Sequence, residues 1–179
     1  MRKDAELVKK LKNPTQKERA FGELLDVYQE RLYWHIRKIV HTHENADDVL
    51  QNTFIRIYKS IGKFQEKSSL HTWMYRIAYN ESIRFLEKNN KKRYDNIETV
   101  SQSNLEVLFE DEYFNGDDIQ KKLNTIIEGF KEKQKRVFQM KYFDELSFRQ
   151  ISEILNVSES TLKSTYYSCV KIIEQKIVE

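Results

Sequence analysis

The chain has 179 residues, of which 39% are hydrophobic and 33% charged, and its formal net charge at pH 7 is +3. Its single cysteine, Cys169, excludes an internal disulfide, and no apolar run approaches the roughly twenty residues that span a bilayer. The basic start also lacks the apolar segment of a secretory signal. We therefore expect a cytoplasmic protein without membrane insertion.

The composition favours an all-α fold. Only four Gly and one Pro occur, which leaves little material for hairpins and tight turns, and Val and Ile recur at helical rather than alternating spacing. Residues 1–93 hold 20 Lys and Arg against 12 Asp and Glu, and residues 119–179 hold 11 against 8. Between them, residues 94–118 hold eight acidic residues and no Lys or Arg. We expect two small helical domains, 1–93 and 119–179, joined by an acidic linker at 94–118, with the basic blocks indicating contact with a polyanion.

The first domain begins with a long helical stripe of apolar residues within 21–40. The polar stretch 41–44 interrupts it, and Asn45 is expected to cap a second helix that carries Asp47 and Asp48 in its first turn, where the helix dipole favours anions.

A glycine at position 62 is a usual helix stop, so the second helix is expected to end there. The polar loop 63–69 then leads to a third helix, which begins at Leu70 and ends in the basic stretch 88–93.

The second domain repeats the helical pattern over 119–130 and 137–143 and ends in a helix-turn-helix pattern. Ser147 and Gln150 form a capping box at the start of a short helix. Asn156 suits a left-handed turn, and Ser158 can cap the last helix.

This spacing is typical of a DNA-binding helix-turn-helix: small Ser152, Asn156 four residues later, and apolar Leu162 six residues after that. An ordinary helical corner with a solvated face is the alternative. The outer face of the last helix carries side chains that can reach phosphates and base edges, namely Ser160, Lys163, Ser164, Thr165, Tyr167, Ser168 and Lys171.

Candidate metal ligands cluster only at His41, His43, Glu44, Asp47 and Asp48. Both histidines fall in a turn, and the acids are explained as residues of a helix start. We predict no metal site. Because no glycine-rich phosphate loop or nucleophile elbow occurs, we also predict no cofactor and no enzyme activity.

Two stretches of the first domain, residues 46–54 (ADDVLQNTF) and 72–80 (TWMYRIAYN), resemble the extracytoplasmic-function sigma factors of bacterial RNA polymerase. Residues 146–173 resemble the domain of the same family that reads the promoter −35 element. The resemblance covers about 18–93 and 119–177. It implies an alternative sigma factor that binds core RNA polymerase, recognises the −35 and −10 elements and promotes melting.

The resemblance also implies polymerase contacts. The positions that match the helix docking on the clamp of the largest subunit are Asp47, Asp48, Gln51, Phe54 and Tyr58. The simpler interpretation has both acids capping a helix and Phe54 in the core, and the two interpretations are compatible.

A second set matches the family's −10 surface, where a base of the melted strand is captured and read. It consists of Phe64, Ser68, Ser69, His71, Thr72, Tyr75, Arg76, Tyr79 and Asn80. The spacing of Trp73 favours a core role over base stacking, whereas Tyr75 and Tyr79 fall on a different face and are expected to meet DNA.

In the last helix the chain departs from the family pattern, because many members carry two or three arginines where this sequence has Lys163 followed by Thr, Tyr and Ser. Fewer cations imply fewer phosphate contacts, and the −35 sequence recognised stays open. Further partners implied are promoter DNA, the flap of the second-largest subunit and an anti-sigma factor. The acidic linker either runs through the basic polymerase cleft or acts as a solvated tether. A stand-alone helix-turn-helix regulator is the alternative function, but it leaves the first domain unexplained.

Overall fold

The computed structural model describes residues 2–95 and 118–178, so nearly all of the acidic linker predicted at 94–118 lies outside the described residues. Every regular element within those ranges is a helix, and the chain divides into two compact units, Met1–Asn96 and Ile97–Glu179. The predictions of an all-α fold and two helical domains are confirmed; the exact boundaries at 93 and 119 stay a prediction. None of the described helices is long and apolar enough to cross a membrane.

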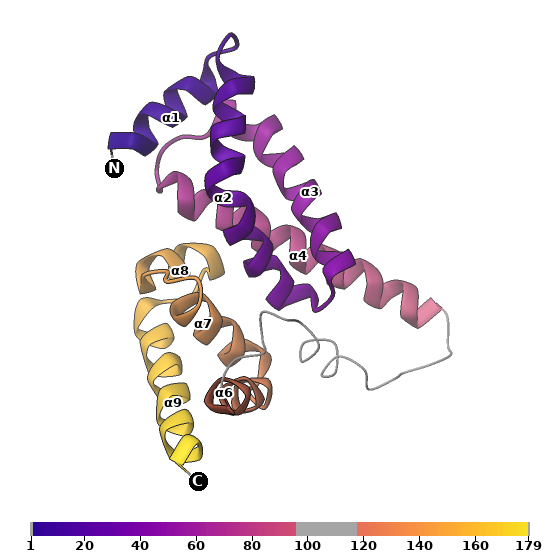
Figure 1. Cartoon of the computed structure of the whole chain (residues 1–179), viewed down its shortest axis with the longest axis vertical. Coiled ribbons are helices and arrows are strands. Elements are labelled where there is room, and N and C mark those ends of the chain that lie inside the picture. Colours follow the sequence, from indigo (N-terminus) through magenta and orange to yellow (C-terminus); the bar gives the residue numbers. More distant parts are fainter. Residues whose placement is uncertain (1, 96–117, 179) are drawn as a thin grey trace. The chain divides into compact units, whose positions relative to one another are not determined.

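The first unit is a helical bundle (Figure 1). Three long helices pack against one another in pairs, and α1 packs on α2 and on η1. Its elements are α1 Arg2–Lys12, α2 Lys17–Val40, α3 His43–Ser60, the 3₁₀ turn η1 Ile61–Lys63, and α4 Leu70–Asp95. The core is formed by apolar side chains that recur at helical spacing, among them Leu24, Leu32, Ile36, Val49, Ile57, Met74 and Ala78.

Three local expectations for this unit are corrected. The basic start was not predicted as a helix, yet α1 forms and buries Val8 and Leu11. Thr42, not Asn45, caps α3, because its hydroxyl accepts a hydrogen bond from the Asn45 backbone N–H at 3.2 Å. Asp47 therefore lies beyond the first turn. At the other end, α3 ends at Ser60, two residues before the predicted stop at Gly62, and the chain continues as the 3₁₀ turn η1.

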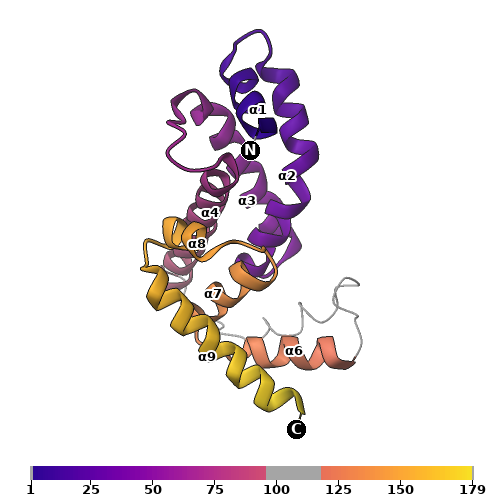
Figure 2. The same ribbon diagram turned by 90° about the vertical axis from the view of Figure 1, so that its left-hand side faces the viewer.

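The second unit is built around its last helix (Figure 2). Helix α9 packs against α6, α7 and α8. The bounds are α6 Asp118–Glu128, α7 Glu132–Tyr142, α8 Phe148–Leu155 and α9 Glu159–Val178. The buried cluster at its centre consists of Ile126, Ile127, Phe130, Phe138 and Cys169.

The predicted helix-turn-helix is present in the second unit. Ser147 Oγ accepts from the Gln150 N–H at 3.2 Å, while the Gln150 side chain accepts from the Ser147 N–H at 2.8 Å. Asn156 adopts the left-handed conformation, with φ 55° and ψ 45°. Ser158 Oγ then accepts from the Thr161 N–H at 3.3 Å where α9 begins. All four residues take the predicted roles, because three act through bonds to near neighbours in sequence and Asn156 acts through its own backbone conformation.

Candidate functional site

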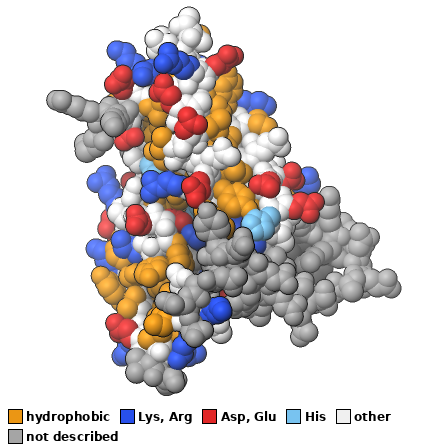
Figure 3. All heavy atoms as spheres, viewed as in Figure 1, with side chains coloured by type: hydrophobic (Ala, Val, Ile, Leu, Met, Phe, Trp, Pro, Cys, Tyr) orange, Lys and Arg blue, Asp and Glu red, His pale blue; other side chains and the backbone are white. Residues whose placement is uncertain are grey.

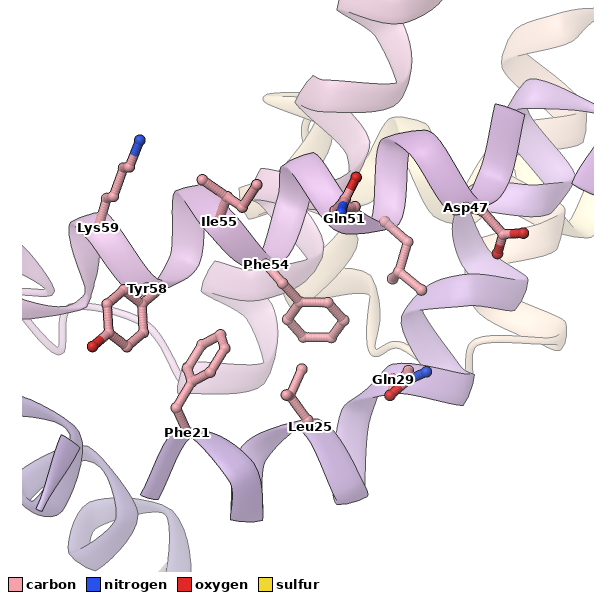
Figure 4. A pocket seen from close by; sticks show the side chains of 10 residues that line it. Phe21, Leu25, Gln29, Asp47, Gln51, Phe54, Ile55, Tyr58 and Lys59 are labelled. Carbon is pink, nitrogen blue, oxygen red and sulfur yellow. The ribbon is translucent and has the colours of Figure 1, made fainter. Parts of the chain in front are cut away.

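An open groove of about 430 Å³ lies between α2 and α3. Figure 4 shows Phe21 and Leu25 of α2 facing Phe54 and Tyr58 of α3 across it. The Phe21 ring centroid lies 6.1 Å from that of Phe54 and 5.0 Å from that of Tyr58, both edge to face. The apolar floor of the groove is therefore formed by three aromatic rings, those of Phe21, Phe54 and Tyr58, packed edge to face.

The rim of the groove is polar and differs between its two ends. Asp47 and Gln51 lie towards one end and Lys59 at the other (Figure 4). At the Lys59 end, the ammonium group of Lys17 sits 3.9 Å from the centroid of Tyr58. Ile55 forms an apolar lip that is 46% exposed. A trough with an apolar floor and charged ends suits one face of an amphipathic helix.

Four of the five residues predicted to bind polymerase line this groove, namely Asp47, Gln51, Phe54 and Tyr58. Asp48 is exposed on α3 but is not among the lining residues. Phe54 is only 8% exposed, so it also belongs to the core, as the simpler interpretation held.

The sequence interpretation did not assign the opposite wall, Phe21 and Leu25, to this site and placed both only in the apolar stripe of residues 21–40. Each is only partly buried in the structure. Their spacing of four residues, repeated in Phe54 and Tyr58, was the available signal that each helix carries an apolar pair on one face.

The second candidate surface is the start of α4 with the loop before it. Ser69 Oγ accepts from the Thr72 N–H at 3.1 Å and bonds the Thr72 hydroxyl at 2.8 Å, which fixes the entry of the helix. Arg76 and Asn80, four residues apart, lie on one face of α4. Asn80 is exposed. The Nε of Arg76 is buried and has no hydrogen-bond partner within the described parts of the chain, while the residue as a whole is partly accessible.

Three residues predicted for this surface are instead buried. Phe64, Thr72 and Tyr75 are 6%, 1% and 1% exposed, so in this structure they lie beneath the surface and not on it. Tyr75 was expected to face outward, but α4 packs against α2, and the Tyr75 ring lies 4.8 Å from that of His35 and 4.4 Å from that of His71. Trp73, which was expected in the core, is only partly buried.

The five other predicted residues of this surface besides Asn80 remain at least partly accessible: Ser68, Ser69, His71, Arg76 and Tyr79.

The loop before α4 is held by a residue that is distant in the sequence. Lys12, the last residue of α1, places its ammonium group 2.5 Å from the Glu66 carboxylate and 5.8 Å from the Phe64 ring centroid. Glu66 itself has φ 58°, a conformation that non-glycine residues adopt at a cost. Phe64 in turn packs on Trp73, with ring centroids 4.9 Å apart. The loop conformation therefore depends on α1 as well as on α4.

The third candidate surface is the outer face of α9. Six of the seven predicted residues are exposed: Ser160, Lys163, Ser164, Tyr167, Ser168 and Lys171. Thr165 is half-buried, and its hydroxyl donates to the Thr161 carbonyl at 2.8 Å. Tyr167 is 61% exposed although its ring lies 5.5 Å from that of Tyr166, which is a high exposure for an aromatic side chain.

Charge alone does not mark these surfaces. On the face drawn in Figure 3, Lys and Arg side chains are interspersed with Asp and Glu, and hydrophobic side chains are exposed between them. Within residues 2–95 and 118–178, no group of three or more His, Cys, Asp or Glu could hold a metal ion. Burial raises the pKa of the Cys169 thiol, so this cysteine is a poor nucleophile.

Comparison with known proteins identifies both units. The model of Sigma-70 region 2 matches residues 24–92, and that of Sigma-70, region 4 matches residues 120–167. The ECF RNA polymerase sigma factor SigW of Bacillus subtilis is 31% identical over 157 residues, which cover 81% of this chain and 82% of SigW. The RNA polymerase sigma-H factor of Pseudomonas aeruginosa is 24% identical, over 97% of this chain and 93% of its own.

Two solved structures share the fold. CnrH, in complex with the cytosolic domain of CnrY, matches with a TM-score of 0.68 at 15% identity, over 96% of this chain and 95% of CnrH. RpoE of Bartonella quintana, in complex with the anti-sigma factor NepR, matches with a TM-score of 0.69 at 17% identity, over 88% of this chain and 96% of its own.

Proposed function

The chain belongs to the extracytoplasmic-function sigma factors, and from that premise we propose how its three surfaces share the work of transcription initiation. As an alternative sigma factor it binds core RNA polymerase, recognises the −35 and −10 promoter elements and promotes melting. The stand-alone regulator is not favoured, because the region 2 match accounts for the first unit as well.

The α2–α3 groove is the proposed docking site for core polymerase, on a helix of the clamp of the largest subunit. The observation that carries this assignment is the groove itself, open and apolar, with Asp47 and Gln51 on its rim and within the residues matched to region 2. A basic amphipathic helix would bury its apolar face against Phe54 and pair a cation with Asp47. The flap of the second-largest subunit is the proposed partner of the second unit.

The start of α4 is the proposed −10 surface. Melted DNA exposes base edges, which the Asn80 amide and the partly accessible guanidinium of Arg76 can read, while neighbouring hydroxyls and Tyr79 contact the strand. Phe64, Thr72 and Tyr75 would support this surface from beneath it. In the second unit, α9 is proposed to enter the −35 major groove, with Ser160, Ser164 and Tyr167 towards the bases.

Three further proposals follow from family membership. The chain makes and breaks no bond, so it is not an enzyme. Because it works with RNA polymerase, we place it in the cytoplasm. An anti-sigma factor is the proposed regulator, supported by the two structural neighbours that were solved with such partners or with a partner's cytosolic domain.

The test replaces Asn80 with alanine and uses Asn89→Ala as the matched control. Asn89 lies nine residues further along α4, which places it on the opposite side of the helix. Asn80→Ala is expected to reduce open-complex formation, measured by permanganate reactivity of melted thymines, while core binding stays at the wild-type level. Asn89→Ala should change neither. Equal loss of core binding in Asn80→Ala would mean that Asn80 is structural. Tight, specific duplex binding by the free chain would instead overturn the sigma-factor mechanism.

A further inference from the structure

Two lysines from different helices of the second unit converge on one aromatic ring. Lys141, near the end of α7, and Lys163, in α9, place their ammonium groups 5.4 Å and 6.0 Å from the centroid of Phe148. Phe148 is the first residue of α8, so three helices meet at this ring. Each ammonium group is attracted by the electron-rich face of the ring, which restrains two otherwise flexible side chains.

The cluster carries an excess of positive charge. Lys163 has a carboxylate neighbour, Glu159, at 3.9 Å. No carboxylate of the described residues is paired with Lys141. Two cations drawn to the same ring repel each other, and one exposed carboxylate offsets only half of their charge. The cluster therefore carries a net positive charge that an external anion can balance.

The position of the cluster indicates which anion. Lys163 belongs to the helix proposed to read the −35 element, and the exposed Tyr167 lies 6.3 Å from the Phe148 ring. A helix lying in a major groove has the sugar-phosphate backbone along both of its sides. A group at the flank of α9 that presents two ammonium ions therefore meets backbone phosphates.

We propose that Lys141 and Lys163, held by Phe148, form a phosphate clamp on the DNA backbone that flanks the −35 element. This inference rests on the proposed −35 function of α9. It adds Lys141 and Phe148, which lie outside the recognition helix, to the DNA contacts. The clamp also compensates for the small number of cations in α9. The second cation comes from α7, since Lys141 lies 22 residues before Lys163 in the sequence.

The test measures promoter affinity of the holoenzyme, the full chain with core polymerase, over a series of salt concentrations. Lys141→Gln should reduce the slope of log K against log salt by about 0.9, the value for one phosphate contact on B-DNA, and weaken binding to every −35 sequence alike. Phe148→Leu keeps an apolar side chain but removes the ring, so it should lower the slope by part of that amount. Lys141→Arg should preserve it.

Lys133→Gln is the matched control. Lys133 is an exposed lysine of the same helix, eight residues from Lys141 and so about 12 Å away along the axis, and its loss should leave the slope unchanged. An unchanged slope for Lys141→Gln overturns the clamp. So does a loss of affinity for core polymerase with an unaltered DNA slope, which would assign the cluster to an acidic protein partner. Failure of the −35 function itself would appear separately, as wild-type holoenzyme that binds intact and scrambled −35 sequences equally well.

Discussion

Replacing Ile55 with alanine isolates what the lip of the α2–α3 groove contributes to polymerase binding. Ile55 is 46% exposed in the free chain. Full burial of an aliphatic side chain of this size contributes about 1.5–3 kcal/mol, so covering the exposed half during docking contributes about 1 kcal/mol. Truncation to alanine removes most of that, and we expect the Kd for core polymerase to rise about fivefold.

The assay is equilibrium binding of the fluorescently labelled chain to core polymerase, with Val27→Ala as the control. Val27 is 56% exposed on α2 but does not line the groove. Both changes should leave the free energy of unfolding within about 0.5 kcal/mol of wild type, because neither side chain is buried. Wild-type affinity of Ile55→Ala, or an equal loss in both variants, would refute the assignment of the groove.

Two predictions concern the second unit. Asn156→Ala should lower its free energy of unfolding in denaturant by about 1–2 kcal/mol, because alanine resists the left-handed conformation at φ 55°, whereas Asn156→Gly should lose clearly less; equal losses would contradict this explanation. Burial raises the pKa of the Cys169 thiol above its ordinary value of 9.0, so the folded state disfavours the thiolate. The contribution of the neutral thiol to the free energy of unfolding is therefore complete below pH 9.0 and is lost as the pH rises through the folded-state pKa. Cys169→Ala should flatten this alkaline decline, measured as the midpoint of thermal unfolding against pH. An unaltered decline in the variant would contradict the explanation.

The sequence predicted best those features that are determined by neighbouring residues. The helix-turn-helix follows from caps and a turn residue whose partners lie within four positions, so its geometry could be derived in full. Thr42 and Asn45 lie three residues apart, and both are residue types that cap helices. Only the position at which α2 ends, Val40, shows that Thr42 is the one that caps α3.

The buried face of α4 could not be derived in the same way. This helix packs against both α2 and α3, so apolar and aromatic residues surround much of its circumference and no single stripe stands out. Tyr75 consequently lies in the core, contrary to the expectation, whereas Trp73 is only partly buried and packs on Phe64. Helix α1 was missed for the opposite reason, because only Val8 and Leu11 of this highly charged segment reach the core.

Through the ion pair between Lys12 and Glu66, the shape of the loop before α4, which is proposed to face the promoter, depends on the first helix. An alignment restricted to the loop would therefore misjudge relatives that lack this lysine, since an identical loop sequence would lose its support for a left-handed residue at position 66. The same link warns against shortening the chain at its beginning to obtain a minimal −10 domain. A fragment without α1 would retain every side chain proposed to read the promoter but would present them on a differently shaped loop.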